Sequence, residues 1–153
     1  MDDIDLKILN ILQKKARVPN VEVARQVGMA PSAILERIRK LEKQGYIDGY
    51  EVRLNPQRFN RNLVAFITVR TEKLENEAEA ARMLAAVPEV QEIHYVSGDD
   101  AFLIKLRAAD THHLGRIIRE RIGNHSFVRS THTAIALSTY KETAQFPIEQ
   151  IDH

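Results

Sequence analysis

The stretch "MAPSAILERIRKLEKQG", residues 29–45, has the start and stop signals of a complete helix. Pro31 suits the first turn, where its missing N–H costs little, and Gly45 is a typical residue just beyond a helix end. Ile34, Ile38 and Leu41 recur at helical spacing and predict one buried face. The other face is rich in lysine and arginine, although the whole chain has a net charge of only +1.

Two further helices are predicted before this one. The first should begin at Asp2 or Asp3 and end near Arg17, and the second should run from Asn20 to Gly28. Their predicted inward-facing residues are Ile4, Ile8, Ile11, Leu12, Val23, Ala24 and Val27. Only residues 28–30 separate the second helix from the third, and this short connection containing a glycine is typical of a helix-turn-helix.

The pattern changes after Gly45. Tyr50, Val52 and Leu54 alternate with polar residues, which predicts a strand after the Asp48–Gly49 turn signal. Residues 56–62 are polar and show neither helical nor strand periodicity of apolar residues, so a linker is expected there. The predicted organisation is a helix-turn-helix domain over residues 1–55, the linker, and a second domain over residues 63–153.

The second domain contains a weak internal repeat. "AFITVR" at residues 65–70 is echoed by "AFLIKLR" at residues 101–107. Helices are expected over residues 75–87 and 110–122, and strands over residues 90–96 and 127–140. The order βαββαβ is the ferredoxin-like arrangement, so the predicted fold class is α+β. Because both faces of the central strands look apolar, we expect the chain to form at least a dimer.

The composition limits the classes of function. With no cysteine in 153 residues, the chain can form neither disulfides nor a cysteine-ligated metal site. The acidic start does not resemble a signal peptide, and the longest apolar stretches are too short to span a bilayer. These features predict a soluble, cytoplasmic protein without contact to a membrane. The low net charge means that any binding to nucleic acid must come from a local cluster of cations.

The basic helix is the candidate for such a cluster. In a helix-turn-helix, the second helix lies in the major groove of double-stranded DNA, where arginine can contact guanine and lysine often contacts phosphates. An ordinary solvated helix face with local Glu–Lys pairs is the alternative interpretation. The predicted DNA-binding residues are Arg25, Ser32, Ala33, Glu36, Arg37, Arg39, Lys40 and Lys43.

Residues 4–56 resemble the DNA-binding signature of the Lrp/AsnC, or feast/famine, transcription regulators, and the second half is similar to the amino-acid-sensing domain of that family. This resemblance implies a homodimer, often assembled further into octamers, that binds DNA and responds to an amino acid or related metabolite bound between dimers. It places the effector near a Gly-Asp/Glu-Tyr-Asp loop and a Thr-x-Thr motif. In this chain Ala101 stands where the family's aspartate is usual. The corresponding residues are Gly98, Asp99, Asp100, Ala101, Thr131 and Thr133.

Other chemistries receive less support from the sequence. Asp99 and Asp100 follow a glycine between two strands, which is first of all a turn. The adjacent His112 and His113 would point in different directions on a helix, so they are poorly placed to share a metal. We expect no cofactor, no metal and no enzymatic activity. A stand-alone metabolite-binding or tetrapyrrole-processing protein of related architecture is the alternative.

Overall fold

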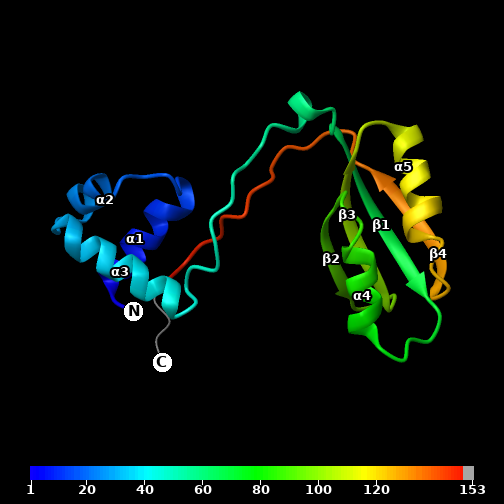
Figure 1. The fold of residues 1–153 in the computed structure, drawn as a ribbon, viewed down its shortest axis with the longest axis horizontal. Helices are drawn as coiled ribbons and strands as arrows, with labels where there is room; N and C mark the ends of the chain where they lie inside the picture. Colours follow the sequence, from blue (N-terminus) through cyan, green and yellow to red (C-terminus); the bar gives the residue numbers. More distant parts are fainter. Residues whose placement is uncertain (150–153) are drawn as a thin grey trace. The chain divides into compact units, whose positions relative to one another are not determined.

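The computed structural model describes residues 1–149 (Figure 1). The chain forms two compact units. One contains residues 1–53 together with the segment that starts at Lys141, and the other contains residues 54–140. Each unit has its own cluster of buried apolar side chains, as expected for two domains that fold around separate cores.

The first unit contains the three predicted helices, α1 (Asp3–Lys14), α2 (Asn20–Val27) and α3 (Pro31–Lys43). Asp2 caps α1, because its side chain accepts a hydrogen bond from the Asp5 backbone N–H. Gly28 ends α2 in the left-handed conformation, with φ 74°, which a residue without a Cβ adopts at little cost. Pro31 occupies the first turn of α3, as the sequence predicts.

The apolar stripes of the three helices meet in one core. The predicted inward-facing residues all contribute to it, and Ile8, Val23 and Ile34 have no exposed surface. Burying such side chains provides most of the stability of short helices, which are marginal in isolation. The helix-turn-helix predicted from periodicity and capping is therefore confirmed.

The predicted strand around Tyr50, Val52 and Leu54 is not formed. Residues 47–55 contain no strand, and these three side chains are exposed. Alternating apolar and polar residues suit a strand, but a strand also needs a neighbouring strand to bond its backbone N–H and C=O groups. Within residues 1–149 no strand pairs with residues 47–55.

The C-terminal segment corrects the predicted domain boundaries. The Gln13 side-chain amide donates a hydrogen bond to the carbonyl of Phe146 at 3.0 Å and accepts one from the Phe146 N–H at 3.1 Å. The segment from Lys141 therefore belongs to the unit of α1 and not to the expected domain over residues 63–153. Because these partners are 133 residues apart, no local pattern could reveal their contact.

The second unit begins with a short 3₁₀ turn, η1 (Pro56–Phe59), within the predicted linker. Its four strands are β1 (Leu63–Thr71), β2 (Val90–Val96), β3 (Ala101–Ala108) and β4 (Val128–Ile135). They form an antiparallel sheet in the order β2-β3-β1-β4. The two crossovers contain α4 (Glu77–Ala85) and α5 (Thr111–Ile117), and α5 continues into the π-helical turn η2 (Ile118–Ile122). The βαββαβ order is confirmed.

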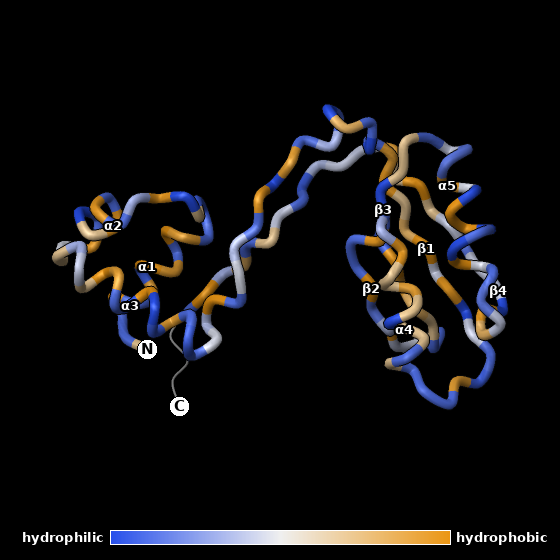
Figure 2. Tube along the Cα trace, in the orientation of Figure 1, coloured by the Kyte–Doolittle hydropathy of each residue, from blue (hydrophilic) through white to orange (hydrophobic). Residues whose placement is uncertain are grey.

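Both crossover helices cover the same face of the sheet. Ile67 and Val69 on β1 share one core with Ile104 on β3, with Leu84 on α4 and with Ile117 on α5. Figure 2 shows that β1 is largely hydrophobic, whereas hydrophobic and hydrophilic residues alternate along α5. This is the pattern of an amphipathic helix packed on a sheet.

The opposite face of the sheet is less apolar than the sequence suggests. The register aligns Phe66 with Lys105 and Thr68 with Leu103, and directly opposed residues share a face. This face therefore carries polar and charged side chains between the apolar ones. Phe66 and Leu103 lie on this face, as the alternation predicts, but their direct partners Lys105 and Thr68 are polar, so the face is mixed and not wholly apolar.

Candidate nucleic-acid interface

The core contacts of α3 determine which of its side chains face outward. Ile34, Ile38 and Leu41 are buried, so the opposite side of the helix is the outer face. Six of the predicted DNA-binding residues lie on or beside this side and are exposed or half-buried. They are Ser32, Ala33, Glu36, Arg39, Lys40 and Lys43. We call this set the outer face of α3.

The cations of the outer face have no ion-pair partner in the described part of the chain. Within residues 1–149, neither Arg39, Lys40 nor Lys43 forms an ion pair. The alternative interpretation of a helix face with local ion pairs expected Glu36 and Lys40 to pair one turn apart, and this pair is not formed in the described structure. The three positive charges are therefore available to an external anion.

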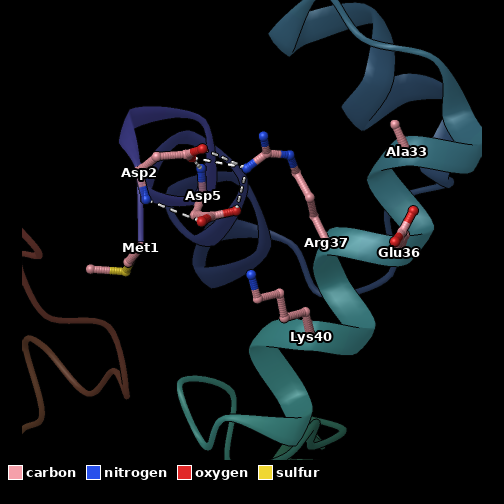
Figure 3. A pocket seen from close by; sticks show the side chains of 7 residues that line it. All are labelled: Met1, Asp2, Asp5, Ala33, Glu36, Arg37 and Lys40. Atoms are coloured by element: carbon pink, nitrogen blue, oxygen red, sulfur yellow. Dashed lines mark hydrogen bonds and ion pairs between the residues drawn. The ribbon is translucent and has the colours of Figure 1, made fainter.

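Arg37 differs from these three cations because it is bound within the first unit. Its Nη1 donates to Oδ1 and Oδ2 of Asp2, at 3.0 and 2.8 Å, and to Oδ1 of Asp5 at 2.9 Å. Figure 3 shows these bonds between α3 and the first turn of α1. We call Asp2, Asp5 and Arg37 the α1–α3 clamp. The sequence indicated Asp2 as a cap, but its contact with Arg37 is a long-range feature that the capping pattern does not reveal.

Two members of the clamp, Asp2 and Arg37, have shifted pKa values. The backbone N–H of Asp5 and then the guanidinium of Arg37 stabilise the charged Asp2 carboxylate and lower the pKa of Asp2 to about 2. The same carboxylates raise the pKa of Arg37. Asp2 and Arg37 are therefore both charged at neutral pH, and Nη1 of Arg37 is already bound by carboxylates.

Arg25 is also engaged inside the chain. Its Nε donates to the Glu22 carboxylate at 3.0 Å on the surface of α2. The pair lowers the pKa of Glu22 to about 2, chiefly through the hydrogen bond from Arg25. An exposed pair of this kind contributes little stability, and a phosphate can compete for the guanidinium.

A shallow groove of about 450 Å³ runs between the N-terminus of α1 and α3. The residues that line it, drawn in Figure 3, are Met1, Asp2, Asp5, Ala33, Glu36, Arg37 and Lys40. The groove thus brings two carboxylates of the clamp close to the outer face of α3. This mixture of charges resembles neither an apolar ligand pocket nor a catalytic centre.

The predicted effector residues lie in the second unit, in two separate places. Gly98, with φ 94°, and Asp100, with φ 49°, shape the tight turn between β2 and β3. Asp99 forms an exposed ion pair of 3.4 Å with Arg70 on β1. Ala101, at the start of β3, has no exposed surface and lies opposite Arg70 in the register.

The two threonines lie elsewhere on the sheet. Thr131 is opposite Val69 and Thr133 is opposite Ile67, so both threonines are on the helix-covered side of β4. Ala101 aligns with Arg70 on the other side, two strands away. Adjacent strands are about 5 Å apart, so one protomer does not bring the loop and the threonines together.

The histidines within residues 1–149 are not gathered into a cluster that would hold a metal. His94 lies beside Leu103 on one edge strand, and His132 lies beside Thr68 on the other. His113 is half-buried, and its Nδ1 accepts a hydrogen bond from the Ala109 N–H. No cluster of three or more potential metal ligands occurs among residues 1–149.

None of the helices within residues 1–149 has both the length and the apolar composition that a membrane-spanning helix needs.

Comparisons with known proteins match both units. Residues 1–48 match the winged helix-turn-helix DNA-binding model, and residues 64–146 match the Lrp/AsnC ligand binding domain. The chain is 35% identical over 149 residues to the HTH-type transcriptional regulator FL11 of Pyrococcus furiosus. The aligned residues make up 97% of each protein. It is 33% identical to the leucine-responsive regulatory protein of Escherichia coli K12, covering 97% of this chain and 92% of that protein.

A solved structure agrees with the fold along nearly the whole chain. The transcriptional regulator NMB0573 of Neisseria meningitidis, crystallised in complex with L-methionine, matches with a TM-score of 0.88 and 29% identity. The match covers 96% of both chains. The similarity therefore includes both units of the present structure.

Proposed function

Because this chain belongs to the Lrp/AsnC family of transcriptional regulators, we propose that it controls transcription by placing α3 in the major groove of double-stranded DNA. The observation that carries this proposal is the outer face of α3, where Arg39, Lys40 and Lys43 are exposed and have no ion-pair partner within residues 1–149. Counterions released from DNA phosphates by such cations provide much of the affinity of DNA-binding proteins.

The residues of the outer face have different proposed roles. Lys40, Lys43 and Arg39 contact phosphates and fix the register of the helix on the duplex. Ser32, Ala33 and Glu36 lie toward the N-terminal half of α3, the part that approaches base edges in helix-turn-helix proteins. Arg25 can leave its exposed partner for a phosphate. Arg37 positions α3 through the clamp, because its Nη1 is already bound by Asp2 and Asp5.

We also propose that an amino acid or related metabolite modulates DNA binding. The regulator NMB0573 binds L-methionine, and the present chain has the same domain order. Because Ala101 and the two threonines lie on opposite sides of one sheet, a ligand that touches both sets must lie between subunits. Binding of this kind would shift the population of assembly states and, with it, the spacing of the α3 helices.

The proposed assembly is a homodimer, formed through the sheet face opposite the one that α4 and α5 cover. Phe66 and Leu103 lie at its centre, with Lys105 and Arg70 beside them. The polar residues at this face would set the register of the two copies. Assembly into octamers remains part of the proposal.

The alternative of a tetrapyrrole-processing or stand-alone metabolite-binding protein has no favouring observation in the described residues, and we propose neither catalysis nor a resident cofactor.

Selection of DNA from a random pool tests this function. The full-length protein should enrich one short motif, present as two half-sites related by two-fold symmetry if a dimer binds. Repeating the binding with a panel of amino acids should identify at least one that changes affinity. Failure to enrich any motif would overturn the DNA-binding proposal, and a motif bound equally with every amino acid would overturn the effector proposal alone.

A further inference from the structure

Glu36 is an exposed carboxylate in the middle of the outer face of α3. Within residues 1–149 it accepts no hydrogen bond and forms no ion pair. The other glutamate of α3, Glu42, differs because it accepts a hydrogen bond from the Tyr50 hydroxyl at 2.9 Å. Glu36 therefore has no role in holding the domain together that the structure reveals.

The position of Glu36 is unfavourable for general attraction to DNA. It lies among the cations that would contact phosphates, with Lys40 one turn further along the helix (Figure 3). A carboxylate there repels phosphates and lowers the affinity for every sequence. Such a loss of affinity is typical of a residue that discriminates between DNA sequences, because it is offset only when the base opposite the residue is the correct one.

The chemistry of the carboxylate restricts that partner. An ionised carboxylate only accepts hydrogen bonds. In the major groove, guanine and thymine present acceptor atoms, which repel it, and adenine presents the N7 acceptor beside its N6 donor. Cytosine presents the N4 amino donor without an adjacent acceptor, so it is the base that fits Glu36.

The neighbouring arginine does not compete for this role. Arg37 is the one arginine of α3 that is held by carboxylates, and its side chain lies toward α1. Resting on the proposed DNA-binding function, we propose that Glu36 is the specificity-determining residue of α3 and that it accepts a hydrogen bond from a cytosine N4 amino group in each half-site.

Base selection with matched variants tests this assignment. The wild type should select a motif with a cytosine in each half-site. Glu36→Gln should change that one position toward adenine, since an amide can accept from N6 and donate to N7. Glu36→Ala should leave the position unselective, with about a fivefold loss of discrimination, while binding to random DNA becomes tighter. Thermal unfolding of each variant should match the wild type because Glu36 is exposed.

Glu51→Gln is the matched control, since it removes one exposed carboxylate from the same unit but outside α3. It should leave every position of the motif unchanged. Identical motifs for the wild type and both Glu36 variants would overturn the assignment while leaving the DNA-binding function intact. A wild type that enriches no motif would overturn the function itself and this assignment with it.

Discussion

Nη1 of Arg37 lies 2.9 Å from Oδ1 of Asp5, and this contact joins α3 to the first turn of α1. Asp2 completes the clamp from the cap of the same helix. The side chains of Arg37 and Asp5 are only 28% and 16% exposed to solvent, so salt and water screen their ion pair less than they screen a fully exposed pair. The clamp thus fixes how α3 lies against the rest of the first unit.

If Arg37 acts through the clamp, Arg37→Met and Asp5→Asn should have similar effects. Each should lower the free energy of unfolding by about 1 kcal/mol, and the double variant should lose less than the sum of the two. Chemical denaturation measures the coupling. Both variants should weaken binding to all DNA sequences equally and leave the selected motif and the salt dependence unchanged.

Arg39→Met provides the comparison for this experiment, because Arg39 is exposed on the same helix and has no ion pair in the described structure. It should weaken DNA binding without changing stability. A change of base preference at one position in Arg37→Met, with stability unaffected, would show instead that Arg37 reads a base.

The low pKa of Asp2 makes part of the stability depend on acidity. Its pKa is 3.8 in the absence of the fold and about 2 in the folded state, so the charged form favours folding. The contribution is present above pH 4 and is lost as the pH falls toward 2. Thermal unfolding of the wild type and Asp2→Asn should therefore differ at pH 5 and converge near pH 2. A difference that stays constant over this range would argue against the clamp as its source.

The contact between Gln13 and Phe146 predicts that the C-terminal segment stabilises the helix-turn-helix unit. Gln13→Ala removes one donor and one acceptor and should cost about 1 kcal/mol in the free energy of unfolding. It should also speed proteolytic cleavage after Lys141. Lys7→Ala is the control, since Lys7 is exposed on the same helix. Equal stability and equal cleavage rates in both variants would contradict this role for the segment.

Local patterns were sufficient for most of the fold. The cap at Asp2, Pro31 in the first turn of α3 and the apolar stripe of Ile34, Ile38 and Leu41 predicted the helices, because these signals lie within a few residues of their effect. The repeated strand-helix pattern likewise predicted the sheet. The strand at residues 50–54 was wrongly predicted because alternation alone supplies no pairing partner.

The candidate site was less predictable. Eight residues were expected to contact DNA, yet the sequence could not distinguish the unpaired Lys40 from Arg37, whose partners lie 32 and 35 residues away. The separation of Ala101 from Thr131 also depends on non-local structure. β1 lies between β3 and β4, and its pairing with each determines which face of the sheet Ala101 and Thr131 occupy. Both features arise from tertiary contacts between distant segments.

The salt dependence of binding to the selected DNA site, compared between the wild type and Lys40→Ala, shows whether the outer face of α3 binds DNA. Lys40→Ala should weaken binding and lower the slope of log affinity against log salt by about one, because one phosphate contact is lost. Lys7→Ala, outside α3, should leave both quantities unchanged. Unaltered affinity and slope in Lys40→Ala would contradict the claim that the outer face of α3 binds DNA.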